Sequence, residues 1–226
     1  MATQLKLSVL WEVADLLPTK EEMHHALVER HGAQMQQKFD QASVAICGLG
    51  GLGSNIAISL ARAGVGRLHL IDFDKVDLTN LHRQQYSVRQ VDMYKTDALK
   101  ANLRDIAPYI EVTTDSVRLS ESNLADYLCN DQIICEAFDN PEAKAMLVNG
   151  VLEQFPEKYI VAASGMAGMS SANSIRTRKI TEHFYLCGDE TTAVAAGVSL
   201  ISSRVMLCAA HQAHAILQLI AGEPDI

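Results

Sequence analysis

Residues 43–84 read SVAICGLGGLGSNIAISLARAGVGRLHLIDFDKVDLTNLHRQ and decide the fold. The stretch opens with a short apolar run at residues 43–47, which is typical of a buried strand. A glycine-rich turn follows, then residues 52–63 with the apolar spacing of a helix, and then a second apolar run at residues 67–71. This order predicts a strand–helix–strand unit whose two strands are parallel.

The turn in this unit carries glycines at the spacing GxGxxG. Gly48, Gly50 and Gly53 fill the three positions, and Gly51 adds a fourth glycine. The first glycine turns the chain, the second lets the backbone approach a phosphate, and the third lets the helix lie close to the strand. The helix N-terminus adds free N–H groups and a partial positive charge. Asp72 ends the second strand, where a carboxylate accepts hydrogen bonds from ribose hydroxyls. The unit therefore predicts a nucleotide site.

A second cluster of polar residues follows the second strand. Asp74, Asn80 and Arg83 lie between that strand and the next predicted helix. Arg83 can hold a phosphate through two parallel N–H bonds, and Lys95, near the start of the helix, can point to the same pocket. Asp139 follows a later strand at its carboxyl end, and a carboxylate beside a triphosphate normally holds Mg²⁺. Such a cluster suits phosphate chemistry better than hydride transfer.

The alternation of strands and helices continues along the chain. Further strands are predicted at residues 110–112, 132–137 and 159–163, and further helices at 94–106, 122–129 and 141–155. Strands separated by helices favour a parallel sheet that is covered on both faces. The predicted fold class is α/β, with a Rossmann-like, mostly parallel sheet.

The C-terminal part departs from this alternation. Residues 173–177 and 183–187 alternate in polarity and can pair as a few antiparallel strands. Residues 194–220 are largely apolar and predict one long helix.

The N-terminal part is polar, and residues 21–39 have helical character. The sequence has no repeat, no low-complexity run and no evident linker. We therefore expect residues 1–226 to form a single domain, with residues 1–40 as a helical N-terminal extension within it.

The net charge and the hydropathy of the chain argue against two classes of partner, nucleic acids and membranes. The chain has 226 residues, a formal net charge of −8 and a pI near 5.4. A nucleic-acid binder usually has a basic excess, so we expect no nucleic-acid partner. No apolar stretch reaches the roughly 18 residues of a membrane span, and the N-terminus lacks the pattern of a signal peptide. We expect no membrane partner and a cytoplasmic location.

The motifs GLGGLG, IDFDKVDLTNLHRQ and FDN, together with Lys95, resemble the ThiF/MoeB/HesA family of adenylating enzymes. The resemblance covers residues 40–165 strongly and the last predicted helix loosely. NLHRQ at this distance from the glycine loop is far more specific than GxGxxG. Within the family the chain is most similar to the short ThiF-type proteins of thiamine biosynthesis. The resemblance implies ATP-dependent adenylation of the C-terminal glycine of a small, ubiquitin-like, ThiS-like sulfur carrier, with release of pyrophosphate.

The resemblance also implies a role for each matched residue. It implies that the nucleotide is held by Gly48, Gly50, Gly51, Gly53, Asp72, Asp74, Asn80, Arg83 and Lys95. It assigns catalysis to Arg83, Lys95 and Asp139, with Asp139 acting through Mg²⁺ bound with ATP. Because the carrier carboxylate is itself the nucleophile, the enzyme needs positioning and cations rather than a base of its own. The implied partners are a carrier ending in Gly-Gly and a second copy of the chain in a homodimer.

The chain departs from the family pattern at several points. Many relatives bind zinc through two CxxC pairs, and this sequence has none, so no zinc site is expected. Cys187 is the candidate thiol near the region where some relatives carry a covalent cysteine. Arg30 is the candidate substitute for an N-terminal arginine that relatives lend across their dimer. Residues 165–169 are expected to line a channel for the carrier tail.

Three other functions stay open. The acceptor could be another carboxylate, on a molybdopterin-synthase carrier, a peptide or a tRNA-linked group, although the acidic charge argues against tRNA. An NAD-dependent oxidoreductase would explain the glycines and Asp72 but would leave Asn80, Arg83 and Lys95 without roles. A non-catalytic relative would bind nucleotide or partners alone.

Overall fold

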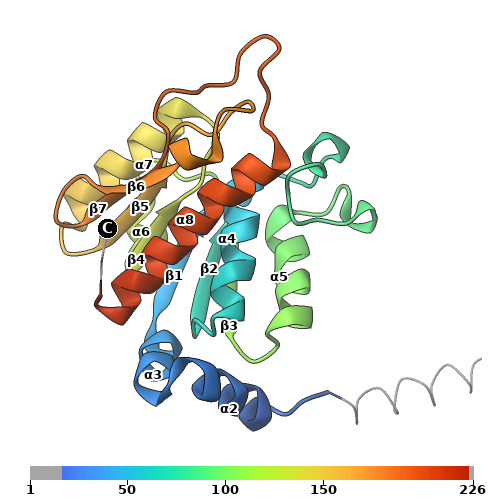
Figure 1. Ribbon diagram of the computed structural model, residues 1–226, viewed down its shortest axis with the longest axis vertical. Coiled ribbons are helices and arrows are strands. Elements are labelled where there is room, and N and C mark those ends of the chain that lie inside the picture. Colours follow the sequence, from blue (N-terminus) through green and yellow to red (C-terminus); the bar gives the residue numbers. More distant parts are fainter. Residues whose placement is uncertain (1–16, 224–226) are drawn as a thin grey trace, which may run out of the picture.

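The computed structural model describes residues 17–223, whose centre is a seven-stranded sheet (Figure 1). The strand order is β3-β2-β1-β4-β5-β7-β6. The strands are β1 (Ser43–Cys47), β2 (Arg67–Ile71), β3 (Glu111–Asp115), β4 (Ile133–Glu136), β5 (Tyr159–Ala163), β6 (Arg176–Lys179) and β7 (Phe184–Gly188). Every pairing in this sheet is parallel except that of β6 with β7. The predicted fold class, a Rossmann-like sheet with a small antiparallel C-terminal part, is confirmed.

Helices cover both faces of the sheet (Figure 1). One face carries α4 (Gly51–Arg62), α5 (Lys95–Ile106) and α8 (Ser202–Ala221), and the other carries α6 (Leu124–Leu128) and α7 (Pro141–Gln154). Successive side chains of a strand point to opposite faces. In β1, Val44 and Ile46 accordingly join the core beneath α4 and α8, while Ala45 and Cys47 join the core beneath α6 and α7. Burial on both faces explains why this strand reads as an uninterrupted apolar run.

The last helix begins later than the sequence predicts. The apolar run from residue 194 predicts a helix, but α8 starts at Ser202, and residues 189–201 form a loop. Gly197 has φ +75°, which no right-handed helix accommodates, and a single bridge joins Ala195 to Val198. Apolar residues of this loop border a cleft instead of covering the sheet. These residues are therefore apolar because they border the cleft, and not because they form a helix that covers the sheet.

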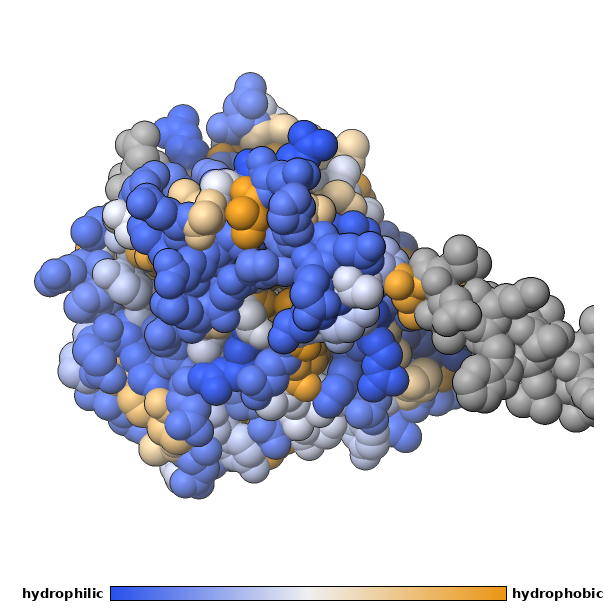
Figure 2. Space-filling view, turned by 90° about the horizontal axis from the view of Figure 1, so that it is seen from below, coloured by the Kyte–Doolittle hydropathy of each residue, from blue (hydrophilic) through white to orange (hydrophobic). Residues whose placement is uncertain are grey.

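Residues 1–16 of the expected N-terminal extension lie outside the described residues. From residue 17 on, the extension contains two helices, α2 (Lys20–His31) and α3 (Ala33–Gln41), separated by Gly32 at φ +82°. Thr19 caps α2 in a capping box with Glu22. No residue of α2 is buried, and Figure 2, which views this end, shows a mostly hydrophilic surface with apolar residues in small separate groups. Across residues 17–223, no helix combines the length and apolarity needed to cross a bilayer.

A partly buried polar network joins β1, β2 and β3 to the residues that precede β4. His69, in β2, places its two ring nitrogens 2.8 Å from Asp115 Oδ2 and 2.9 Å from Asp131 Oδ2. Asp131 also accepts a hydrogen bond from the Ser43 hydroxyl, which in turn accepts one from Arg67. These contacts connect the amino ends of β1 and β4 to the neighbouring strands. The 3₁₀ turns η1 (Leu78–Asn80), η2 (Val88–Gln90) and η3 (Ala172–Ser174) complete the described elements.

Candidate functional site

A cleft of about 1310 Å³ opens at the carboxyl ends of the central parallel strands. Sheet order reverses between β1 and β4: the chain runs from β1 outward to β3, then returns to the other side of β1. At such a reversal the loops that leave the two strands diverge, and ligands of open α/β sheets bind in the resulting crevice. All the predicted site residues except Gly53 line this cleft: Gly48, Gly50, Gly51, Asp72, Asp74, Asn80, Arg83, Lys95 and Asp139.

At two positions of the loop, only glycine fits, because a Cβ would clash with the backbone. Gly48 has φ +94°, and a Cβ there would lie 2.8 Å from the Ala137 carbonyl oxygen. A Cβ on Gly53 would lie 1.8 Å from the Gly48 carbonyl oxygen, which no rearrangement of a side chain can relieve. Gly53 therefore acts within the loop by letting α4 approach β1. The first turn of α4, which begins at Gly51, faces the cleft with its unpaired N–H groups.

Asp72 fixes the glycine loop to the end of β2. Its Oδ2 accepts the Leu49 N–H at 2.6 Å, and its Oδ1 accepts the Asp74 N–H at 2.7 Å. Lys95, the first residue of α5, is 6% exposed and places Nζ 2.9 Å from Asp74 Oδ2 and 3.7 Å from Asp72 Oδ2. Burial raises the pKa of Asp72, and the Lys95 ammonium works against that rise. A buried cation is thus held beside the loop by one buried and one half-exposed carboxylate.

The segment after β2 brings unsatisfied polar atoms to the cleft. Asn80 lies in η1, where its Oδ1 accepts the Asp77 N–H. Arg83 donates from Nη1 to the Thr79 carbonyl oxygen at 3.3 Å, but its buried Nε has no partner. The Gln84 Oε1 is likewise buried without a partner. Buried polar groups normally have partners, so these two atoms point to a polar ligand in the cleft.

The donor set of the cleft fits ATP with Mg²⁺. A glycine cradle, a helix N-terminus and a buried lysine fit a polyphosphate. Asp139 follows β4 with an exposed carboxylate, next to Asn140, whose side chain caps α7. Mg²⁺ is usually bound through one or two carboxylates together with substrate phosphates, so a single acid at this place fits the ion.

Sequence reasoning missed an ion pair at the cleft, in which Lys144 lines the cleft and Glu136 lies buried behind it. Glu136, the last residue of β4, is fully buried, and Lys144 Nζ lies 3.0 and 2.9 Å from its two carboxylate oxygens. Amides of Phe138 and Ala163 also donate to this carboxylate. Burial raises the pKa of Glu136, and Lys144 opposes that rise. The signal in the sequence was an acid at the end of an otherwise apolar strand, IICE.

Comparison with known protein families identifies the family of this chain. The family described as "ThiF family" matches residues 23–226. The chain belongs to the ThiF family. This ThiF-family chain is 38% identical over 113 residues to the molybdopterin-synthase adenylyltransferase of Haemophilus influenzae, an alignment that covers 50% of this chain and 46% of that protein. It is 36% identical over 117 residues to the adenylyltransferase and sulfurtransferase MOCS3 of Aedes aegypti, covering 51% of this chain and 27% of that protein. The alignments therefore span less than half of either relative.

Solved structures show the same ThiF-family fold. E. coli tRNA N6-threonylcarbamoyladenosine dehydratase, TcdA, in complex with ATP superposes with a TM-score of 0.81 at 20% identity, covering 92% of this chain and 98% of that chain. E. coli MccB with ATP gives a TM-score of 0.67 at 21% identity, with 86% and 60% covered. At these identities the likeness concerns the fold.

The remaining candidates of this ThiF-family chain lie away from the nucleotide loop. Cys187 is fully buried in β7, and burial raises the pKa of its thiol to about 11, which opposes the thiolate that a covalent role needs. Arg30 is exposed in α2, and it is not among the residues that line the cleft. Figure 1 shows α2 at the end of the molecule opposite the loop that joins β7 to α8. Within residues 17–223, no group of three or more His, Cys, Asp or Glu side chains is arranged to hold a metal ion.

Proposed function

We propose that this chain uses ATP to adenylate the C-terminal carboxylate of a small, ubiquitin-like sulfur carrier. The observation that carries the proposal is the convergence of the glycine loop, Asp72, Arg83, Lys95 and Asp139 on one cleft, although they come from separate segments. The cleft also holds two buried polar atoms without partners. An NAD-dependent oxidoreductase has no use for a buried lysine and an arginine at this place, so we set that reading aside.

In the proposed reaction, a carrier carboxylate oxygen forms a bond to the α-phosphorus of ATP. The bond from that phosphorus to the bridging oxygen of the β-phosphate breaks, and pyrophosphate leaves with the electron pair. The loop amides and Asp72 are assigned to binding and orienting the nucleotide. Arg83 and Lys95 supply cations where negative charge accumulates, and Asp139 binds Mg²⁺, which neutralises the same charge. Lys95 is ready for this role because it already lies desolvated against two carboxylates.

The uncharged half of the cleft favours a peptide tail as the acceptor. This half is lined by Ser164, Gly165, Met166, Ala167, Thr192, Ala193, Val194, Leu200 and Val205. None of these lining residues carries a charge, and most have small side chains. A tRNA-linked acceptor would require cations for its phosphates, whereas a narrow peptide tail without bulky side chains fits such a lining. The lining therefore supports a carrier ending in Gly-Gly over a tRNA-linked carboxylate.

The test is ATP–[³²P]pyrophosphate exchange with Mg²⁺ and a panel of carriers. Within the carrier class, the sequence favours a ThiS-like protein of thiazole biosynthesis, while one relative is named for molybdopterin synthase. Exchange that requires one carrier, and stops when its last glycine is deleted, would establish both the reaction and its partner. Tight ATP binding without exchange for any carrier or peptide would refute the proposed function.

We also propose that the chain acts as a homodimer in the cytoplasm. The support is the family membership. Sedimentation velocity over a range of concentrations would test it, and a monomer at all of them would refute it.

A further inference from the structure

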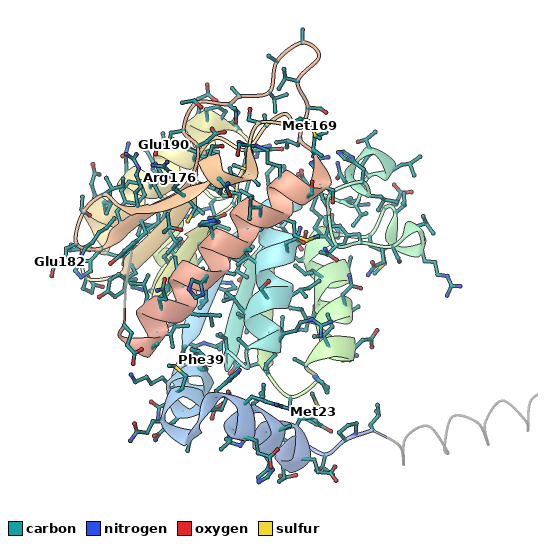
Figure 3. The ribbon with its side chains drawn as sticks, viewed as in Figure 1. Met23, Phe39, Met169, Arg176, Glu182 and Glu190 are labelled. Carbon is teal, nitrogen blue, oxygen red and sulfur yellow. The ribbon has the colours of Figure 1, made fainter. Side chains whose placement is uncertain are left out.

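Two segments together build the uncharged side of the cleft. We call residues 164–171, which follow β5, and residues 189–201, which follow β7, the acceptor wall. Backbone hydrogen bonds join them: Asp189 N–H to Gly165 O and Glu190 N–H to Ser164 O, both at 2.9 Å, near the strands, and Gly168 N–H to Ser199 O at 2.9 Å further out. Figure 3 labels Met169 and Glu190 in these segments, at the end of the molecule opposite α2 and α3.

The acceptor wall has little regular structure of its own. Apart from one bridge between Ala195 and Val198, its residues belong to no helix or strand. Met169 is 82% exposed and Val194 is 65% exposed, so neither contributes much burial. Met166 and Ala167, next to β5, are buried, but the outer residues gain little burial to offset the conformational entropy lost when the loop is ordered. A further interaction must hold this outer part of the acceptor wall in one shape.

A buried ion pair supplies that interaction. Arg204, in the first turn of α8, is bonded to Asp189, and their side chains are 5% and 4% exposed. Arg204 Nη1 also donates to the carbonyl oxygens of Ser170 and Ser171 at 2.8 and 2.7 Å. Its Nη2 donates to the Ser174 hydroxyl at 3.0 Å. One guanidinium therefore fixes the far end of the first segment to the near end of the second.

The Asp189 carboxylate fixes the second segment in turn. Its Oδ1 accepts the N–H groups of Thr191 and Thr192 at 2.9 and 2.8 Å, and the Thr192 hydroxyl contacts both oxygens. That hydroxyl also accepts the Ala167 N–H at 3.0 Å, which closes a circuit between the two segments. Burial works to raise the pKa of Asp189, but these hydrogen bonds and Arg204 outweigh it and lower the pKa to about 2.

The two segments are packed tightly where they leave β5 and β7. A Cβ on Gly165 would lie 2.2 Å from Asp189 Oδ1, and a Cβ on Gly188 would lie 1.8 Å from the Ser164 carbonyl oxygen. The ion pair and the strand ends are therefore in direct contact. Movement of Asp189 would be transmitted to residues 164–167, which line the cleft.

We propose that Asp189 and Arg204 are positioning residues that hold the acceptor wall in the shape that receives the carboxylate substrate. The inference rests on the proposed function and deepens it, because it assigns these residues to the acceptor and not to the nucleotide. Their bonding partners lie in the acceptor wall and η3, and none is a residue assigned to ATP. Loss of the ion pair should therefore weaken acceptor binding and leave ATP binding intact.

The experiment compares two conservative variants with a matched control. Arg204→Lys keeps the charge but loses the planar fork that reaches four partners. Asp189→Asn keeps the shape of the side chain and removes its charge. The control is Asp131→Asn, which neutralises another buried carboxylate, 3% exposed, at the amino end of β4 and away from the cleft. For each variant we would measure amide hydrogen exchange of the ATP-free chain, the Kd of ATP, and the KM of the carrier in pyrophosphate exchange.

Both variants should show faster amide exchange confined to the acceptor wall and an unchanged Kd for ATP. The KM of the carrier should rise about tenfold, as expected when a loop must be ordered on binding. The control should change neither the exchange of the acceptor wall nor the KM. Unchanged exchange in the acceptor wall, or a Kd for ATP that rises with the carrier KM, would overturn the inference while the proposed function stands. If the wild-type chain turns over no carrier, the proposed function and the acceptor role fall together, and hydrogen exchange still decides whether the ion pair orders the wall.

Discussion

Replacing Lys144 with methionine should destabilise the fold by leaving the Glu136 carboxylate buried without its cation. In the native chain, Lys144 Nζ lies 3.0 and 2.9 Å from the two oxygens of a carboxylate side chain that is 1% exposed. Breaking a buried pair from one side costs about 3–5 kcal/mol. Because Lys144 itself is 22% exposed, water can approach the remaining acid, and we expect the lower end, about 3 kcal/mol of unfolding free energy at neutral pH.

The penalty should depend on pH in a defined direction. Burial raises the pKa of Glu136, and Lys144 opposes that rise, so the variant should have a still higher pKa. A carboxyl whose folded pKa exceeds its unfolded value, about 4.3, destabilises the fold where it is ionised. The penalty is therefore complete above the folded pKa and disappears as the pH falls toward the unfolded value.

Urea unfolding followed by circular dichroism, near neutral pH and near pH 5, would measure both effects. The control is the double variant Lys144→Met with Glu136→Gln, which leaves no buried charge and should regain most of the lost stability at either pH. A loss below about 1 kcal/mol, the range of exposed ion pairs, would refute the reasoning. So would a loss that is the same at both pH values.

Three further predictions concern other parts of the chain. Burial works to lower the pKa of His69, but its two aspartate partners outweigh burial and raise the pKa above 6.5. The stabilisation that protonated His69 gives the fold should therefore be complete below the unfolded pKa. It should be lost as the pH rises through the folded pKa. The melting temperature should fall as the pH rises through the folded pKa, and His69→Gln should make the melting temperature less dependent on pH. A melting temperature that rises over the same pH range would contradict the raised pKa of His69. Lys95→Met should slow carrier-dependent pyrophosphate exchange by about 10²–10³-fold, or about 2.7–4 kcal/mol, and wild-type exchange would remove Lys95 from the mechanism. Gly53→Ala should abolish ATP binding in calorimetry, because its Cβ would lie 1.8 Å from the Gly48 carbonyl oxygen, and normal binding would show that the loop can rearrange.

The sequence predicted what depends on local pattern. The strands and the glycine turn appear as short-range signals, and the motif residues converge because parallel strands end at one edge. The role of Lys144 was not predicted, because nothing in the helix start PEAK indicates that its lysine reaches an acid on another element. The bond from Arg204 to Asp189 is likewise a tertiary contact with no periodic signature. The start of α8 was predicted too early because apolar residues that line a cleft give the same hydropathy signal as a helix that covers a sheet.

Because most of the thiols are buried, thiol-specific reagents can label the folded chain at a single cysteine. Of its five cysteines, four are buried, and Cys129 is exposed. Maleimides react with accessible thiolates, so under native conditions they should modify this position alone. Cys129 follows α6 and precedes β4, at the end of the sheet opposite the cleft. A fluorophore placed there would leave the cleft open, and its anisotropy would report the arrival of a carrier protein by slower tumbling, without any turnover.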